Sequence, residues 1–327
     1  MERHFFPETI TETALGRPSN THFPMSLLVV GTMAFDTIET PFGKAERIIG
    51  GAATYICWAA SQFARELHAV SVIGEDFPES ELEALRARGV RTEGVQRLHG
   101  QKSFFWEGRY HDDLNSRDTL VTELNVLADF DPVLPEAARH CDFVMLGNLT
   151  PAVQRRVLEQ MAARPKLVAL DTMNFWMDVA LGELLEVLRM IDVLTINDEE
   201  ARQLSGERSL AKAAKKILTM GPKFLVIKKG EHGALLFHRE GTFFAPALPL
   251  EEVFDPTGAG DSFAGGFMGY IAHTGDTSYE GMKKAIIYGS ATASFCVEQF
   301  GIEKIKSVQP DQMAGRVAEF EKLTRWG

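Results

Sequence analysis

Short apolar runs of strand length recur along the chain. They are rich in β-branched and aliphatic residues and occupy positions 27–31, 69–73, 143–146, 167–171, 193–196 and 224–228. Amphipathic stretches of helical period lie between most of them, for example at 151–163, 178–190 and 208–219. Such repeated strand–helix units predict an α/β fold with a mostly parallel central sheet flanked by helices. Because the runs are continuously apolar, we expect helices on both faces and ligands beyond the carboxyl ends of the strands.

Two segments, 33–49 and 99–125, interrupt this rhythm. In the second, aromatic and polar residues alternate and no helical period is present. We predict strands outside the main sheet that form a small β flap, or lid, over the active site. The alternative is a plain surface hairpin. The flap residues that could touch a substrate are Phe105, Trp106, Arg109, Asn115 and Arg117.

Residues 1–24 mix Pro, Thr, Glu and His without a period, which is typical of a loose extension ahead of a single domain at 25–327. They lack the basic start and the apolar stretch of a secretory signal. Met25 directly precedes the first strand-like run, so the natural start could be there.

The composition excludes several classes of protein. A net charge of −11 over 327 residues disfavours binding to nucleic acid, and no apolar run approaches the length of a membrane span. Cys57, Cys141 and Cys296 lie far apart in apolar contexts, which predicts reduced core residues. We therefore expect a cytoplasmic protein whose partner is a small molecule.

The segment DPTGAGDSFAGG at 255–266 carries the clearest chemistry. It follows a strand-like stretch at 242–254 and opens a helix that begins with glycines. Gly258 and Gly260 permit a backbone whose N–H groups face a phosphate at the helix N-terminus. Asp261 could be an ordinary helix cap, but beside a phosphate it can accept a proton from a substrate hydroxyl.

This segment, extended to DPTGAGDSFAGGF, is very similar to the carboxyl-terminal signature of the PfkB/ribokinase family of carbohydrate and nucleoside kinases. The resemblance implies a ribokinase-like fold and transfer of the γ-phosphoryl group of Mg-ATP to a hydroxymethyl group of a small sugar. It makes Asp261 the catalytic base and the backbone amides of Gly258, Ala259 and Gly260 the anion hole. Such a transfer needs positioning and neutralised charge more than covalent chemistry.

The resemblance also implies two ion-binding sites. TINDEEARQLSG at 195–206 is similar to the family's Asn-x-x-Glu motif, so Asn197 and Glu200 would organise Mg²⁺, through water. A helix-capping role is the alternative. Many members also bind K⁺ near the anion hole, and Asp255 and Thr257 lie at the matching positions.

Two further segments would contact ATP. VIKKGEHGALLF at 226–237 resembles the family's nucleotide-contacting turn through Lys228 and Gly230, although a solvated lysine at a strand end is an alternative. In a helix expected at 279–299, Gly289 and Ala293 would leave room for an adenine. Helix packing explains these small residues equally well.

The acceptor site implied by the resemblance draws on an Asp after the first strand, a Gly-Gly pair before the first long helix, and an Asp-x-x-Asn motif. The matching residues are Asp36, Gly50, Gly51, Asp171 and Asn174. Where the family usually has Asn, this chain has Tyr55, so the choice of sugar stays open. A nucleoside acceptor is one alternative, and a non-catalytic ligand-binding or regulatory protein on the same scaffold is another. A flap with one exposed face could also pair with a second copy into a homodimer.

Overall fold

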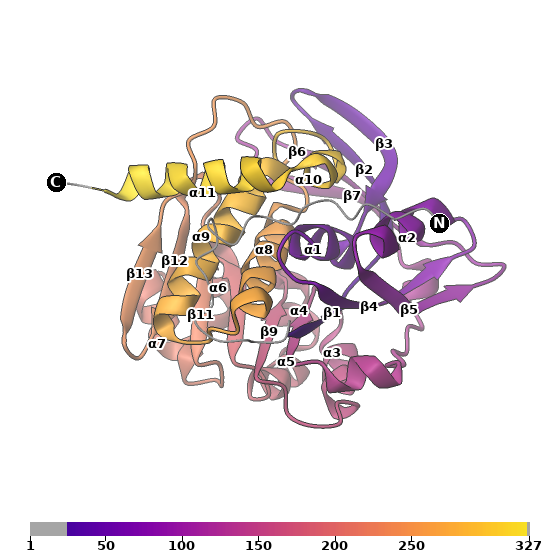
Figure 1. The fold of residues 1–327 in the computed structure, drawn as a ribbon, viewed down its shortest axis with the longest axis horizontal. Helices are drawn as coiled ribbons and strands as arrows, with labels where there is room; N and C mark the ends of the chain where they lie inside the picture. Colours follow the sequence, from indigo (N-terminus) through magenta and orange to yellow (C-terminus); the bar gives the residue numbers. More distant parts are fainter. Residues whose placement is uncertain (1–24, 326–327) are drawn as a thin grey trace, which may run out of the picture.

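The computed structural model describes residues 25–325, so the loose extension predicted for 1–24 lies outside the described residues. In this part of the chain the central sheet has nine strands in the order β13-β12-β11-β10-β9-β8-β1-β4-β5 (Figure 1). All neighbours are parallel except at β12 and β13, which are antiparallel. The strands of this sheet are β1 Ser26–Val30, β4 Glu66–Gly74, β5 Val90–Leu98, β8 Phe143–Leu146, β9 Leu167–Asp171, β10 Val193–Asn197, β11 Phe224–Lys228, β12 Ala234–His238 and β13 Gly241–Ala245.

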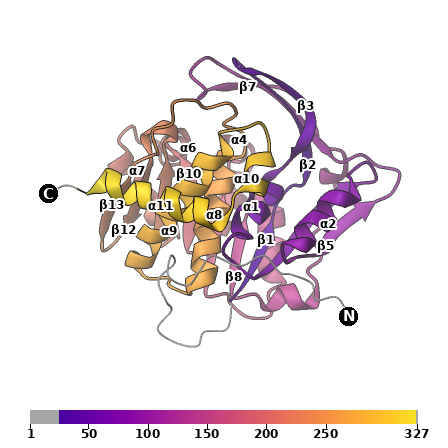
Figure 2. The ribbon, with the colours of Figure 1, turned by 45° about the horizontal axis from the view of Figure 1, so that its top comes forward.

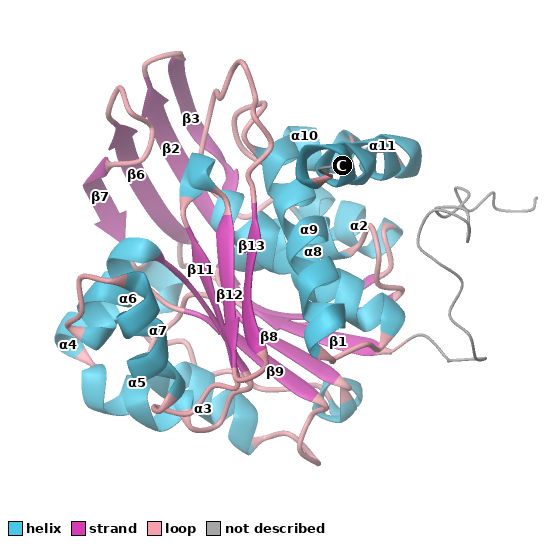
Figure 3. Cartoon of the chain, turned by 90° about the vertical axis from the view of Figure 1, so that its left-hand side faces the viewer, coloured by secondary structure: helices cyan, strands magenta, loops and turns pink. Residues whose placement is uncertain are grey.

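Helices cover both faces of this sheet (Figure 3). Successive residues of a strand point to opposite faces, so each apolar strand contributes side chains to a buried cluster on either side. In β1, Leu27 and Val29 join one buried cluster, while Leu28 and Val30 join the other. The first cluster includes residues of α1, α2 and α8 to α11, and the second includes residues of α3 to α7. The helices are α1 Ala52–Ala60, α2 Glu79–Ala87, α3 Pro151–Glu159, α4 Asn174–Val179, α5 Leu181–Leu188, α6 Asp198–Ser205, α7 Leu210–Leu218, α8 Ala259–Thr274, α9 Tyr279–Cys296, α10 Glu303–Ser307 and α11 Pro310–Thr324, with short 3-10 turns η1 Asn125–Leu127, η2 Glu136–His140 and η3 Gly230–His232.

The predicted α/β architecture is confirmed, and the six apolar runs coincide with strands of the central sheet, except that Gly31 follows the end of β1. One strand prediction was too long. The stretch 242–254 is a strand only as far as Ala245, where β13 ends. Pro246 and Pro249 follow, and each lacks the backbone N–H that a continuing ladder would need.

A second sheet contains both segments that break the strand–helix rhythm. Its order is β3-β2-β6-β7, with β2 parallel to β6 and the other neighbours antiparallel. Figures 2 and 3 show it standing apart from the central sheet and to one side of the helical layers. We call it the lid sheet; its strands are β2 Ala34–Thr40, β3 Gly43–Gly50, β6 Phe104–Tyr110 and β7 Arg117–Glu123.

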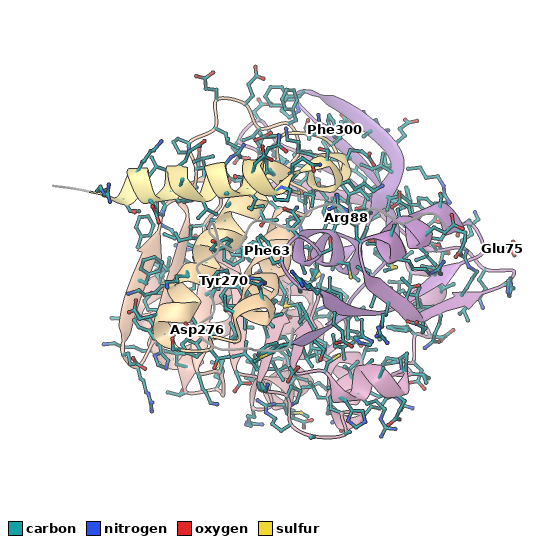
Figure 4. The ribbon with its side chains drawn as sticks, in the orientation of Figure 1. Phe63, Glu75, Arg88, Tyr270, Asp276 and Phe300 are labelled. Carbon is teal, nitrogen blue, oxygen red and sulfur yellow. The ribbon has the colours of Figure 1, made fainter. Side chains whose placement is uncertain are left out.

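Helix α8 is anchored at the end far from its glycine-rich start. Tyr270 stacks on Tyr288 of α9 with ring centroids 4.3 Å apart, and Phe63 packs edge-on against the same Tyr288. Figure 4 shows Phe63 and Tyr270 close together beside α1 and α8. Aromatic packing of this kind fixes the helix whose first turn carries the predicted chemistry. Within residues 25–325, no helix combines the length and the apolar composition needed to cross a membrane.

Candidate active site

Three neighbouring parallel strands each end on a polar residue. Asp171 closes β9, Asn197 closes β10 and Lys228 closes β11. The register pairs Asn197 with Lys228 directly, so these residues meet at one edge of the sheet. The Lys228 ammonium donates to the Asp171 carboxylate at 2.7 Å, and their side chains are 18% and 9% exposed. The structure thus pairs Lys228, which was predicted to contact ATP, with Asp171, which was predicted to contact the acceptor.

The first turn of α8 lies against this ion pair. A Cβ atom added to Gly260 would lie 3.0 Å from the Lys228 ammonium, which places the lysine directly beside the predicted anion hole. The cap residue Gly258 has a φ of 75°, a conformation that favours glycine. First-turn N–H groups have no partner within their helix. The N–H of Ala259 donates to the carbonyl of Pro256 at 3.2 Å, so a phosphoryl oxygen would share or replace that bond.

Asp261 is half-buried in the same turn. Burial, and then the negative charge of Asp171, raises the pKa of its carboxyl to about 7, against the opposing charges of Lys228 and Arg117. A carboxyl that exchanges its proton near neutral pH is suited to general base catalysis. Arg117 begins β7, so the lid sheet contributes a positive charge to this environment.

Asn197 and Glu200 form a reciprocal capping box at the start of α6. The Glu200 N–H donates to the Asn197 side-chain oxygen at 2.8 Å, and the Asn197 N–H donates to Glu200 Oε2 at 2.7 Å. The capping role is therefore present. Burial, and then the charge of Asp171, raises the pKa of Glu200 to about 7.

Magnesium fits the chemistry of this corner. The cap bonds occupy one oxygen of Glu200, and the negative charge of Asp171 raises the pKa of both Glu200 and Asp261. A hard cation is bound by such oxygen ligands. Among the described residues, no group of three acidic, His or Cys side chains could hold a metal alone, so an ion here would also need water or phosphate ligands.

Gly50 and Gly51 lie beside Asp36, whereas the predicted acceptor residues Asp171 and Asn174 contact Lys228 and Gln203 instead. The Asp36 carboxyl is buried, and burial together with the weaker effects of the Asp255 and Asp261 charges raises its pKa to about 7. A Cβ on Gly50 would lie 1.9 Å from the Asp36 carboxylate, and one on Gly51, whose φ is 91°, would collide with the backbone of Thr32. The glycine pair is therefore required for packing around Asp36 within the protein itself.

The Tyr55 ring packs against Gly258, the cap residue of α8. The ring lies where a side chain on Gly258 would be, at 2.4 Å from such a Cβ. The side chain is 1% exposed, and its hydroxyl has no hydrogen-bond partner among the described residues. Burial, followed by Cys296 and the carboxylates of Asp255, Asp36 and Asp261, raises its pKa well above the usual range.

Asp255 and Thr257, the residues predicted for a potassium ion, hold the loop before α8. The Asp255 carboxylate accepts from the N–H groups of Thr257 and Gly301 at 2.8 and 3.0 Å. The Thr257 hydroxyl donates to the hydroxyl of Tyr110, at the end of β6, at 3.1 Å. This bond ties the lid sheet to the loop before α8, and Tyr110 was not among the predicted site residues. The period-two alternation from Trp106 could have identified it, since residues 106 and 110 of a strand share a face.

Other predicted residues make contacts within the protein. The Asn174 amide donates to Gln203 of α6 at 2.5 Å. Gly289 packs against the backbone of Phe263 in α8, as the helix-packing alternative expects, and Ala293 packs partly buried against the first cluster. In the lid sheet, Arg109 forms an ion pair with Glu39 at 3.0 Å.

Gly230 receives the tip of the lid sheet. A Cβ on this glycine, whose φ is 52°, would lie 2.9 Å from the side-chain oxygen of Asn115. Asn115 lies in the turn between β6 and β7, so that hairpin reaches from the lid sheet to the turn after β11. The hairpin spans one side of the site.

The chain is similar to known kinases in sequence. The model of the pfkB family of carbohydrate kinases matches residues 26–307. A cytidine kinase from Thermococcus kodakarensis is 31% identical over 249 residues, covering 75% of this chain and 87% of that protein. A 2-dehydro-3-deoxygluconokinase from Thermoproteus tenax is 29% identical over 240 residues, covering 68% and 73%.

The fold is shared with solved structures as well. The nucleoside kinase from Methanocaldococcus jannaschii, an archaeal member of the ribokinase family, superposes with a TM-score of 0.71 at 19% identity, covering 91% of this chain and all of that one. The predicted ribokinase-like fold is confirmed, and the kinase alternative is favoured over the non-catalytic one. The chain belongs to the pfkB family of carbohydrate kinases, and it is a kinase.

Proposed function

We propose that this kinase transfers the γ-phosphoryl group of Mg-ATP to the hydroxymethyl group of a sugar, either free or within a nucleoside. The observation that carries the proposal is the position of Asp261, with its pKa of about 7, in the glycine-rich first turn of α8 beside Lys228. The relatives named above include both a nucleoside kinase and a kinase of a sugar acid. Both kinds of acceptor are therefore compatible with family membership.

The reaction follows from these residues. Asp261 accepts the proton of the acceptor hydroxyl as its oxygen attacks the γ-phosphorus, and the bond to the bridging oxygen of ADP breaks. The amides of residues 258–260 would donate to the phosphoryl oxygens, and Lys228 would offset their charge. Asp36 would accept hydrogen bonds from hydroxyls of the acceptor and fix its orientation.

Asn197 and Glu200 would hold a magnesium ion through water, and that ion would neutralise charge on the nucleotide phosphates. Asp255 and Thr257 stay our prediction for a potassium ion, and the surroundings of Gly289 and Ala293 stay our prediction for the adenine. Dependence of the rate on each metal, measured in chelated and sodium-only buffers, would test the two ions separately.

The decisive experiment replaces the base. Asp261→Asn keeps the shape of the side chain, and we expect kcat to fall by about 10²- to 10⁴-fold because the base is lost. ADP release would be followed with a panel of sugars and nucleosides, with Asp112→Asn, an exposed carboxylate of the β6–β7 turn, as the matched control. Near wild-type turnover by the Asp261 variant on an accepted substrate would refute the mechanism.

We also propose a homodimer that pairs two lid sheets. The edge strands of the lid sheet are β3 and β7, and most of their residues are exposed. Sedimentation velocity would test it, and a concentration-independent monomer would contradict it.

A further inference from the structure

Trp106 lies along the lid sheet instead of standing away from it. A Cβ on Gly108 would lie 2.1 Å from the Trp106 ring, so the indole covers the bare backbone two residues further along β6. Its N–H donates to the hydroxyl of Thr119 on β7 at 3.3 Å. The guanidinium of Arg117 lies 5.8 Å from the ring centroid. These contacts fix a half-buried, flat aromatic surface that only a glycine at position 108 allows.

This surface faces the site. Trp106 is the register partner of Asp36 in the parallel β2–β6 pair, so the two side chains share a face of the lid sheet. Tyr110 lies on that face four residues later and bonds Thr257 of the anion-hole loop. Arg117, the register partner of Tyr110 on β7, lowers the pKa of Asp261. These three observations place the indole on the face of the lid sheet that carries Asp36 and is turned toward Thr257 and Asp261.

We propose that Trp106 is a stacking platform for a planar heteroaromatic ring, and that the acceptor is consequently a nucleoside. This inference rests on the proposed function. With the hydroxymethyl group at Asp261 and the ribose hydroxyls at Asp36, the base extends toward Trp106, whose strand lies about 5 Å from that of Asp36. A free sugar offers hydroxyls and no π-face to cover the indole, whereas a base covers it by stacking.

The test compares acceptors in one enzyme. We would measure kcat/KM of the wild type, Trp106→Leu and Trp106→Phe with cytidine, adenosine, inosine and free ribose at saturating Mg-ATP. We expect Trp106→Leu to lose at least about tenfold with nucleosides, the usual size of a lost stacking contact, while its change with ribose stays under about twofold. Trp106→Phe should lie between, because it keeps a smaller aromatic face.

A second variant moves the platform without removing it. Gly108→Ala places a methyl group where the indole lies, so the ring must shift, and we expect the same selective loss with nucleosides. Gly182→Ala on α5 is the matched control, because a Cβ there meets nothing within 4 Å. Nucleoside binding by calorimetry, with thermal unfolding to verify the fold, would accompany both.

The possible outcomes distinguish failure of the Trp106 stacking platform from failure of the proposed function. If the wild type phosphorylates nucleosides and the nucleoside-to-ribose ratio is unchanged in Trp106→Leu and Gly108→Ala, the platform is refuted and the proposed function stands. A wild type that prefers ribose to every nucleoside refutes it as well. If nothing is phosphorylated but nucleosides bind and Trp106→Leu weakens that binding tenfold, the platform is supported and the proposed function fails.

Discussion

The raised pKa of Asp261 predicts that its ionised carboxylate destabilises the folded protein. Moving its pKa from 3.8 to about 7 corresponds to about 4 kcal/mol of lost stability above neutral pH. We expect about 1–2 kcal/mol in practice, because the half-buried carboxylate keeps part of its hydration and Lys228 lies nearby. Asp261→Asn, which carries no charge, should therefore be more stable than the wild type at high pH.

The sign of the pH dependence follows from proton uptake. Between pH 4 and 7 the folded protein holds a proton on Asp261 that the unfolded chain has released, so wild-type stability falls as pH rises through this window. The Asp261→Asn variant lacks this slope. Its advantage should be largest at pH 8.5 and less than half as large at pH 5.

Urea unfolding followed by circular dichroism at these two pH values measures the difference without any substrate. Asp112→Asn, in the exposed β6–β7 turn, controls for the loss of one negative charge from a protein of net charge −11. A variant no more stable than the wild type at pH 8.5, or equally stabilised at both pH values, would show that Asp261 is not held in an environment that favours its neutral form.

Three further predictions follow from the same site. Gly258→Ala should lose activity and about 2 kcal/mol or more of stability, because Gly258 has a positive φ and the Tyr55 ring fills the space that a side chain would need. Urea unfolding measures the loss, and a variant as stable as the wild type would contradict the packing of Tyr55 against Gly258. Lys228→Met should lower the free energy of unfolding by about 2–4 kcal/mol, because it leaves the Asp171 carboxylate buried without its partner. Adding Asp171→Asn should recover most of that loss, and a double variant as unstable as Lys228→Met would count against the ion pair. The wild-type kcat/KM should rise through a pKa near 7 as Asp261 loses its proton, and a flat profile from pH 5.5 to 8.5 would exclude it as the titrating base.

The central sheet could be predicted from sequence because its strands are buried on both faces and are therefore continuously apolar. The same logic placed Asp171, Asn197 and Lys228 at strand ends, where parallel topology brings them to one edge. Their mutual contact was not predictable. Which strands neighbour each other is set by non-local pairing, and no local pattern shows that β9 and β11 flank β10.

The strand pairing within the lid sheet could not be predicted from local sequence patterns. The broken strand–helix rhythm indicated strands in 33–49 and 99–125, but not that β2 would pair in parallel with β6 and so place Asp36 beside Trp106. Gly108 looks like an ordinary strand glycine until the indole is seen covering it. The Asn-x-x-Glu motif remained ambiguous for a different reason, since the capping box and a water-mediated ion site use the same two side chains.

The buried charged groups of the candidate site lower the stability of the folded protein. Asp36, Glu200 and Asp261 each have a pKa raised to about 7 chiefly by burial, while Lys228 already pairs with Asp171. In the proposed function, a magnesium nucleotide would bring a cation to the carboxylates and phosphate charge to the lysine, and an acceptor would bring hydroxyls to Asp36. These ligands would balance the buried charges of the site. Binding would relieve the repulsion between the carboxylates, so part of the stability lost to these buried charges would return as affinity for the ligands.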